Sequence, residues 1–307
     1  MMQKKDLRQE DNRRKIQDIM LKQSSKKKFI DRIMTGFAII CVISAMIPLG
    51  SILIEVVKNG ISAISIEFLT QPPGSFFLGH GGIAPAIQGT LIVVGLASLI
   101  GAPIGILTGI YLSEYAGNGI FPSAVRFFND VLTGLPSIVM GIVGYVTLVL
   151  LLGSFSVWAG AFALSIIMIP IVVRVTEESF KIVPNSIREA AQSLGIPKWK
   201  ITLFITMKSA KSGILTGIVL AISRIAGETA PLIMTILGTS LFFTGFSGPI
   251  DALPLRIWRL ASQPYESAHS QGWGAALVLI LIVLILSIVL RLFVQSKTGF
   301  KLKRATF

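Results

Sequence analysis

Long blocks of apolar residues constrain the fold of this chain more than any other feature of its sequence. A soluble domain disperses its apolar residues at helix or strand period, whereas here they gather into stretches of about 20 residues, the length that crosses a hydrocarbon core. Hydrophobic residues make up 52% of the 307 residues. Charged residues make up only 14%, against about a quarter in a soluble domain. The chain is therefore predicted to be an all-α polytopic membrane protein.

Six transmembrane helices are predicted from these blocks. They are residues 34–57, 83–112, 131–153, 155–173, 213–238 and 275–294. Pro103, Pro136 and Pro170 lie in or at the edges of these segments. Proline is tolerated there because neighbouring helices or water can satisfy the carbonyl groups that it leaves free.

The distribution of basic residues predicts the orientation of these helices. Residues 1–32 hold eleven Lys and Arg residues, and the connection 174–211 holds seven more. The loops expected on the opposite side hold only Lys58, Arg256 and Arg259. Because Lys and Arg gather on the cytosolic side of a membrane, both termini are expected in the cytosol. The net charge of +13 then reflects topology and contact with anionic lipid, not nucleic-acid binding.

These features divide the chain into four parts. They are a basic cytosolic tail at residues 1–32, a first transmembrane helix at 33–57, a transmembrane domain at 83–294 and a second basic tail at 295–307. In the outer loop before the sixth helix, Leu253, Ile257 and Leu260 fall at helical spacing. They predict a short helix that either plugs the outer end of the bundle or touches a partner that delivers cargo.

A charged, helix-forming connection at residues 176–211 separates the fourth and fifth helices. Ser186 is a plausible N-cap with Glu189 three residues on, which is the capping-box spacing. Gly195 followed by Pro197 predicts the end of this helix and the start of a second one. The sequence thus predicts a helix, a sharp turn and a helix, exposed in the cytosol as a docking surface.

The centre of this connection resembles a known motif. The run Glu189-Ala190-Ala191, followed after three residues by Gly195, resembles the EAA loop of permease subunits in binding-protein-dependent ABC importers. In that family the short helix of the loop sits in a groove of an ATPase subunit. The resemblance implies that Glu189, Ala190, Ala191 and Gly195, with the neighbouring Arg188, couple this chain to an ATPase. The family's motif later ends in a proline, where this chain has Lys208.

Other stretches resemble the phosphate branch of the same family, and the similarity covers roughly residues 83–294. They are residues 169–178, 183–191, 225–232, 252–255 and 261–264. The resemblance implies an ABC importer type-1 transmembrane domain in a bacterial or archaeal cytoplasmic membrane. It also implies a homologous permease, an ATPase dimer that binds ATP and Mg²⁺, and an extracytoplasmic phosphate-binding protein as partners. No cofactor is expected on this chain itself.

Two charged residues in the fifth predicted helix form a candidate anion site. Arg224 lies eleven residues into that helix, about 16 Å deep, and Glu228 follows one turn later. Gly213, Gly217 and Ala221 fall on the same face, so another helix can approach it closely. The planar guanidinium fork suits phosphate oxygens, and Glu228 can accept a hydrogen bond from a protonated phosphate.

Two further residues are assigned to the same substrate pathway. Thr229 follows Glu228 within the stretch that resembles the phosphate branch, and Arg174 lies at the inner end of the fourth helix. Arg174 also fits a side chain that reaches the membrane interface, as long basic side chains near helix ends do. Equally, the Arg224–Glu228 pair fits a structural ion pair that locks two helices together.

Several other functions remain open at this level. The cargo can be another oxyanion, such as molybdate or sulfate, and the chain can be a secondary transporter or channel that needs no ATPase, or a structural subunit. An enzyme is not expected, because no phosphate-binding loop sequence and no Ser/His/Asp set in one plausible pocket occur. His80 and His269 are isolated and Cys41 is the one cysteine, so neither a metal site nor a disulfide is expected.

Overall fold

The structure is a computed structural model that describes residues 3–74, 81–117 and 119–297. His80 and residues 298–307 of the predicted second tail lie outside the described residues. The described part is helical, with no strand in it beyond one isolated bridge between Leu237 and Ile250. The predicted all-α class is therefore confirmed for the part of the chain that the structure describes.

The first of two structural units, residues 1–57, consists of most of helix α1 (Gln3–Gly60). The sequence predicts the basic tail and the first membrane helix as separate segments, yet α1 continues across their border at residue 32. The tail is rich in Lys, Arg and Gln, which favour helix, so nothing local ends the helix there. Within α1, the membrane-spanning candidate begins at Ile30.

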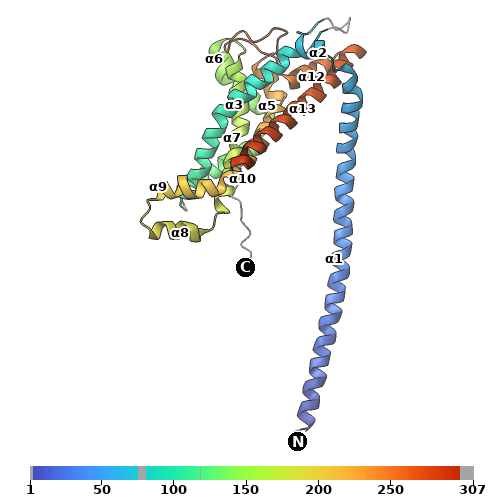
Figure 1. The fold of residues 1–307 in the computed structure, drawn as a ribbon, viewed down its shortest axis with the longest axis vertical. Coiled ribbons are helices and arrows are strands. Elements are labelled where there is room, and N and C mark those ends of the chain that lie inside the picture. The colour runs from blue at the N-terminus through green and yellow to red at the C-terminus, as the bar shows by residue number, and fades with distance from the viewer. Residues whose placement is uncertain (1–2, 75–80, 118, 298–307) are drawn as a thin grey trace. The chain divides into compact units, whose positions relative to one another are not determined.

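The second unit, residues 58–307, is built around four long helices (Figure 1). They are α3 (Ala84–Ile110), α7 (Val157–Lys181), α10 (Met207–Ala226) and α13 (Glu266–Lys297). Helix α7 packs against α3 and α10, and α10 also packs against α13. The core between them is apolar, with Val93, Leu164 and Ile225 fully buried. Pro103 and Pro170 lie inside α3 and α7, as predicted.

Glycines bring α3 and α7 into close contact. A Cβ atom added to Gly105 would lie 2.7 Å from Cβ of Val172, and one added to Gly109 would lie 2.6 Å from Cβ of Thr176. Carbon atoms cannot approach so closely, so only glycine fits at these two positions. Small residues four apart are the usual way in which membrane helices pack backbone to backbone.

The third predicted helix, residues 131–153, is wrong at its start. Residues 131–134 belong to α4 (Ile120–Gly134), and α5 (Ser137–Gly144) begins after a bend of 105°. The bend lies at Leu135 and Pro136, where Leu135 has extended backbone angles. The physical cause is proline, which disfavours helical geometry in the residue before it. Helix α5 continues through a π-helical turn (Tyr145–Val149) into α6 (Leu150–Leu152).

The fifth predicted helix, residues 213–238, is broken in the structure. Helix α10 ends at Ala226 and α11 (Ala230–Thr235) begins four residues later. Two local causes explain the break. Gly227 disfavours helix, and the ring of Pro231 would clash with the carbonyl of Gly227 four residues earlier if the helix continued. Hydropathy, on which the prediction rested, detects neither effect.

The number of membrane-spanning helices agrees with the prediction. Within the described residues, five helices are long and apolar enough to cross a membrane, and the bent pair of α4 with α5 and α6 makes six. The sixth predicted helix, residues 275–294, lies inside the longer α13. One end of the bundle carries the short helices α2 (Ile66–Thr70) and α12 (Leu253–Ala261), and the opposite end carries α8 and α9 (Figure 1).

Helix α12 is the short helix that the sequence predicts before the sixth membrane helix. Leu253, Leu255 and Leu260 are fully buried, and α12 packs against α3 and α13, so its apolar residues are buried in this end of the bundle. Asp251 precedes it and accepts a hydrogen bond of 2.7 Å from Nε of the buried Arg256. Burial raises the pKa of the Asp251 carboxyl, although the Arg256 guanidinium opposes the change.

Candidate functional site

The charged connection folds as a helix, a turn and a helix, but its beginning differs from the prediction. Thr176, Glu177 and the next two residues belong to α7, which runs to Lys181. The following helix is α8 (Asn185–Ser193), with Pro184 at its N-cap position and no side-chain cap. The predicted N-cap at Ser186 is therefore wrong. The chain enters the helix directly after Pro184, whose ring fixes its backbone angle near the helical value.

The end of α8 agrees with the prediction. Gly195 has φ of +74°, a conformation that favours glycine. Its N–H donates to the carbonyl of Gln192, and the N–H of Ile196 donates to the carbonyl of Ala191. This is the paired hydrogen-bond pattern with which many helices end. Helix α9 (Lys198–Lys200) follows Pro197 and runs through a π-helical turn (Ile201–Thr206) into α10 without a break at Lys208.

The five predicted coupling residues do not share one surface. Glu189, Ala190 and Gly195 are exposed at the α8 end of the bundle, whereas Ala191 is buried. Arg188 turns inward, where its guanidinium contacts Oε1 of Glu114 at 2.7 Å. The exposed part of α8 is thus available to another protein, and Arg188 instead attaches α8 to this chain.

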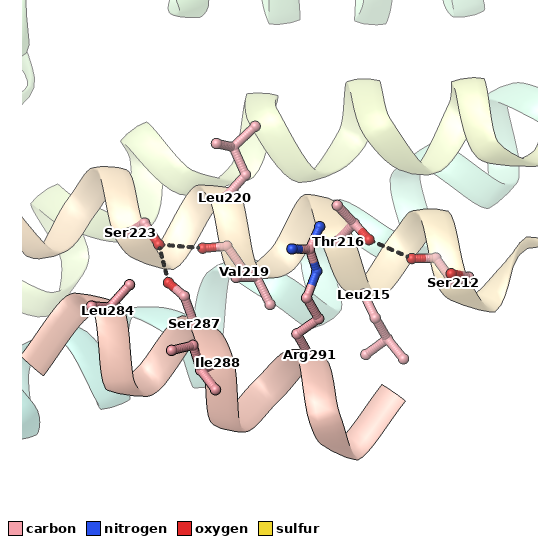
Figure 2. Close-up of a pocket in the computed structure, with 10 residues that line it drawn as sticks. All are labelled: Ser212, Leu215, Thr216, Val219, Leu220, Ser223, Leu284, Ser287, Ile288 and Arg291. Carbon is pink, nitrogen blue, oxygen red and sulfur yellow. Dashed lines mark hydrogen bonds between the residues drawn. The ribbon is translucent and has the colours of Figure 1, made fainter. Parts of the chain in front are cut away.

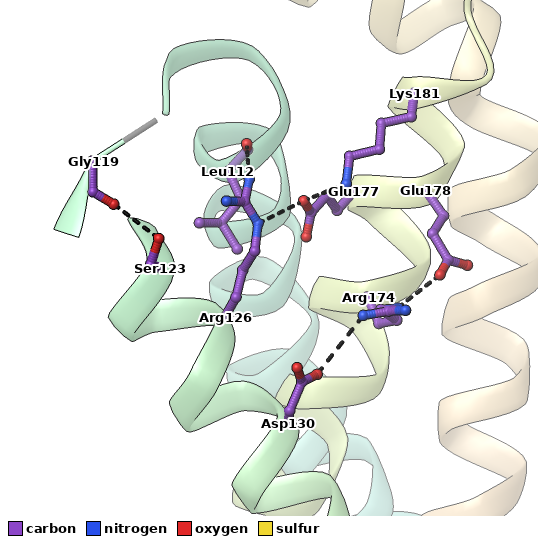
Figure 3. Close-up of polar contacts among 9 residues, drawn as sticks. All are labelled: Leu112, Gly119, Ser123, Arg126, Asp130, Arg174, Glu177, Glu178 and Lys181. Atoms are coloured by element: carbon purple, nitrogen blue, oxygen red, sulfur yellow. Dashed lines mark hydrogen bonds and ion pairs between the residues drawn. The ribbon is translucent and has the colours of Figure 1, made fainter. Parts of the chain in front are cut away.

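Two ionic clusters tie α4 to α7 near that end (Figure 3). Nε of Arg126 on α4 contacts Oε1 of Glu177 on α7 at 2.9 Å, and Nζ of Lys181 contacts the same oxygen at 2.6 Å. Nε of Arg174 donates to Glu178 at 2.7 Å, and its guanidinium lies 3.7 Å from Asp130. Arg174, predicted to line the pathway, is therefore exposed and already paired with two carboxylates.

Arg224 lies in the last turn of α10, two residues before its last residue Ala226, and not in the middle of a longer helix as predicted. Its side chain is 57% exposed, and its Nε lies 3.9 Å from Oε1 of Glu228. That distance allows charge attraction but is too long for a hydrogen bond. Glu228 lies beyond the end of α10, in the break, and reaches Arg224 through the turn of the chain. Thr229 is the N-cap residue of α11.

The predicted small-residue face of α10 does pack against another helix. Gly217 and Ala221 are buried. A Cβ atom added to Gly217 would lie 2.3 Å from Val175 of α7, and one added to Gly213 would lie 2.4 Å from Ser179. Arg224 therefore extends from the edge of a closely packed helix interface.

Arg224 is positioned where two helix breaks meet. It lines a small cavity with Leu135 and Ser137 of the α4–α5 break and with Pro170 of α7. Ser137 is the first residue of α5, and the N-terminal end of a helix carries partial positive charge. The cavity has a volume of about 20 Å³, room for roughly one water molecule. The surroundings therefore favour an anion, but this conformation is closed to one as large as phosphate.

A wider groove lies elsewhere, between α10 and α13 (Figure 2). It has a volume of about 510 Å³ and apolar walls, with Ser212, Thr216, Ser223 and Ser287 and the guanidinium of Arg291 inside it. The hydroxyl oxygens of Ser223 and Ser287 lie 3.0 Å apart. The sequences 207–227 and 267–307 contain no Asp or Glu, so Arg291 faces no carboxylate from either helix.

Sequence reasoning did not single out this groove or the α4–α5 break. The groove has a signal in hindsight, because hydroxyl residues at positions 212, 216 and 223 repeat on one face of α10. Pro136 is the corresponding signal for the break. Among the described residues, no group of three His, Cys, Asp or Glu side chains is arranged to hold a metal ion.

Comparison with known proteins identifies the family to which this chain belongs. Residues 101–298 match the family model described as binding-protein-dependent transport system inner membrane component. The phosphate transport system permease protein PstA of Haemophilus influenzae is 41% identical over 274 residues, which cover 88% of this chain and 96% of that protein. The probable phosphate transport system permease protein PstA of Methanocaldococcus jannaschii is 38% identical over 80% of this chain and 87% of its own.

Solved structures with the same fold are more distant in sequence. A chain of a bacterial alginate ABC transporter has a TM-score of 0.64 at 17% identity and covers 88% of this chain and 96% of its own length. A chain of the MetNI methionine ABC transporter has a TM-score of 0.58 at 15% identity, over 70% of this chain and 95% of its own. With these matches, the chain belongs to the binding-protein-dependent transport system inner membrane components, and among them to the PstA family of phosphate transport system permeases.

Proposed function

We propose that this chain is the permease subunit of an ATP-driven phosphate importer and that phosphate passes Arg224. The observation that carries the proposal is the state of that arginine, whose side chain is more than half exposed and forms no hydrogen bond to the neighbouring glutamate. An arginine within a membrane-spanning segment carries a desolvation cost, which reaches about 2.5 kcal/mol or more at the centre of a helix. An unbonded one is best explained by a ligand that uses its donors during function.

The chemistry at this position fits a protonatable oxyanion. The fork of Arg224 can donate two parallel hydrogen bonds to phosphate oxygens. Glu228, 15% exposed and within charge reach, can accept a hydrogen bond from a protonated phosphate, which sulfate at neutral pH lacks. Thr229 adds a hydroxyl beside it, and Arg174 is a further cation for the path toward the α8 end. Molybdate and sulfate are the competing cargoes that this arrangement should reject.

The energy source is assigned to a separate protein. Glu189 and Ala190 are exposed on α8, and this surface would dock an ATPase dimer (PstB-like) that carries ATP and Mg²⁺. Membership of the binding-protein-dependent transport family supports this assignment. A homologous permease (PstC-like) would complete the pathway, and an extracytoplasmic phosphate-binding protein would deliver the cargo. This chain would then bind no cofactor, and it would open its closed Arg224 cavity when the ATPases move α8.

Topology follows from the charge distribution. The basic segment 174–211, with α8 at its centre, would face the cytosol, as would the tails 1–32 and 295–307. Residues 83–294 would form the transport domain and residues 176–211 its coupling loop. Impermeant labelling of single cysteines placed in α8 and near α12 tests this orientation, since only the α12 cysteine should react from outside intact cells.

The decisive experiment is phosphate uptake by the full complex reconstituted in vesicles. We expect ATP-dependent uptake that excess sulfate does not compete, loss of uptake in Arg224→Ala, and loss of the co-purifying ATPase in Glu189→Lys. Arg291→Gln serves as the matched variant, because it removes an exposed arginine from the other anion-compatible groove.

The outcomes separate the rival functions. Uptake that falls with Arg291→Gln and survives Arg224→Ala would move the pathway to the α10–α13 groove. Transport by this chain without ATP would instead identify a secondary transporter, and intact uptake in both variants would leave the chain a structural role.

A further inference from the structure

Arg188 is the residue through which α8 is bonded to the rest of the chain. Its guanidinium makes two hydrogen bonds to Oε1 of Glu114, from Nε at 3.1 Å and from one terminal nitrogen at 2.7 Å. It also donates to the carbonyl oxygens of Phe180 at 2.8 Å and Val183 at 2.6 Å, at the end of α7. Among the described residues, no other α8 side chain forms a hydrogen bond outside its own helix.

The pair is shielded from water. The side chain of Arg188 is 16% exposed and that of Glu114 is 5% exposed. A charged pair with such burial is held firmly, because separating it would leave a carboxylate in a poorly solvated site. A displacement of α8 should therefore be passed to Glu114 and not absorbed by a loose side chain.

Glu114 lies in a π-helical turn (Tyr111–Tyr115) that extends α3. In an α-helix the N–H of Ala116 would donate to the carbonyl of Leu112, but here it donates to Tyr111, one residue earlier, at 2.8 Å. The carbonyl of Leu112 is thereby released. It accepts a hydrogen bond of 2.9 Å from the guanidinium of Arg126 on α4 (Figure 3). The π turn thus joins two guanidinium groups from different helices.

Helix α4 leads from Arg126 to the bend at Leu135, which lines the same cavity as Arg224. Contacts therefore run without a gap from α8 through Arg188, Glu114 and Leu112 to Arg126, and along α4 to the closed cavity. The bend of 105° is where a shift of α4 would change the width of that cavity. Each link is a hydrogen bond between polar groups or a rigid helix.

We propose that the π turn Tyr111–Tyr115 is a relay that converts displacement of α8 into movement of α4 and opening of the Arg224 cavity. Arg188 and Glu114 are positioning residues in it, since neither is placed against cargo. The relay rests on the proposed function in two respects, since an ATPase moves α8 and the Arg224 cavity lies on the path of the cargo. It specifies which of this chain's own contacts carry the motion.

The test uses the full complex purified with its ATPase. Arg188→Lys keeps the charge but cannot reach Glu114 and both carbonyls at once, and Glu114→Gln keeps an oxygen acceptor without the charge. We expect the ATPase to co-purify and hydrolyse ATP, with phosphate imported per ATP reduced about tenfold. Ser113→Ala, in the same π turn and without a hydrogen bond from its side chain, should behave as the unmodified complex.

A double-mutant cycle examines whether the two arginines act in one route. Arg126→Lys alone should lower phosphate imported per ATP, and adding Arg188→Lys should lower it little further, because consecutive links fail together. If the double variant lowered phosphate imported per ATP by the product of the two single-variant factors, the two arginines would act independently and the relay would be overturned. So would unchanged import per ATP in both Arg188→Lys and Glu114→Gln, or loss of the ATPase from these complexes.

A second measurement does not depend on the cargo. Spin labels at exposed Gln192 on α8 and exposed Phe128 on α4, in a Cys41→Ser background, report the distance between the helices with and without ATP. If the relay operates, α8 and α4 move together, so ATP binding leaves this distance unchanged in the unmodified complex. In the Arg188→Lys complex the link is broken, so ATP binding should change the distance. A distance that behaves alike in both complexes contradicts the relay, even if the complex imports another solute.

Discussion

Two arginine–glutamate pairs in this chain are built in opposite ways. Arg188 and Glu114 are 74 residues apart, are mostly buried and share two hydrogen bonds. Arg224 and Glu228 are four residues apart, yet they lie 3.9 Å from each other without a hydrogen bond, and the arginine is 57% exposed. The same two residue types thus form a buried, hydrogen-bonded ion pair at Arg188 and Glu114, whereas the donors of Arg224 form no hydrogen bond with Glu228.

The difference between the two pairs arises from the groups that surround each guanidinium. Around Arg188, two backbone carbonyls and the Asn185 side chain take up the remaining donors, so the guanidinium has no capacity left for a ligand. Arg224 lies in the last turn of α10, and no backbone carbonyl of the described residues accepts a hydrogen bond from its side chain. A buried, fully bonded pair suits mechanical coupling, and an exposed, unbonded arginine suits a passing anion.

The largest effect is expected from Arg188→Ala. Removing the guanidinium leaves Glu114 charged and poorly solvated, so the free energy of unfolding of the second unit should fall by about 3 kcal/mol. Thermal unfolding in detergent measures the change. Glu114→Ala together with Arg188→Ala should recover part of it, because no uncompensated charge then remains. An unaltered unfolding temperature in Arg188→Ala would contradict the assignment of a tight joint.

Arg224→Ala should show the reverse pattern. Uptake is expected to fall at least about thirtyfold, the loss of roughly 2 kcal/mol of charged hydrogen bonding to the anion. Stability should change by less than about 0.5 kcal/mol, since an exposed pair contributes little. Uptake and unfolding measured on one preparation check both. A large loss of stability with normal uptake would make the pair structural.

Glu228→Gln sharpens the role of the second residue in the loose pair. If Glu228 accepts a hydrogen bond from a protonated phosphate oxygen, Glu228→Gln should weaken the preference for phosphate over sulfate by about tenfold. This factor corresponds to the free energy of about one hydrogen bond. Competition of phosphate uptake by sulfate measures the preference. A preference equal to that of the unmodified complex would assign discrimination to other groups, with Thr229 the next residue to replace.

Arg174→Gln should have the smallest effect on stability. Its pair with Glu178 is solvent-exposed and of the helical four-residue spacing, worth about 0.3–0.5 kcal/mol. The expected shift in unfolding temperature is therefore within the error of most measurements. A fall in unfolding temperature as large as that of Arg188→Ala would mean that the ion pair between Arg174 and Asp130 is needed to hold α7 and α4 together.

The features predicted correctly from the sequence are those set by nearby residues. Apolar blocks of membrane-spanning length gave the number of helices, and Gly195 before Pro197 gave the turn after α8, because both depend on residues within one or two helical turns. The short helix α12 was predicted for the same reason, from apolar residues at helical spacing.

The errors share a physical origin as well. Hydropathy counts ignore the clash between Pro231 and Gly227, so the fifth helix was predicted through its break, and Glu228 was given a helical register that it lacks. The contact that turns Arg188 inward was not foreseen, because its partner Glu114 is distant in the sequence. Ser186 was taken for a cap because Pro184 two residues earlier was not considered as the start of the helix.

The central claim is that Arg224 meets an anion in a water-filled path that α8 opens and closes. The direct test places a cysteine at position 224 in the Cys41→Ser background of the full complex and follows its reaction with a water-soluble, membrane-impermeant thiol reagent. The account predicts reaction from one side of the membrane at rest and from the other when ATP hydrolysis is trapped with vanadate. Reaction only with lipid-soluble reagents, unchanged by nucleotide, would contradict it.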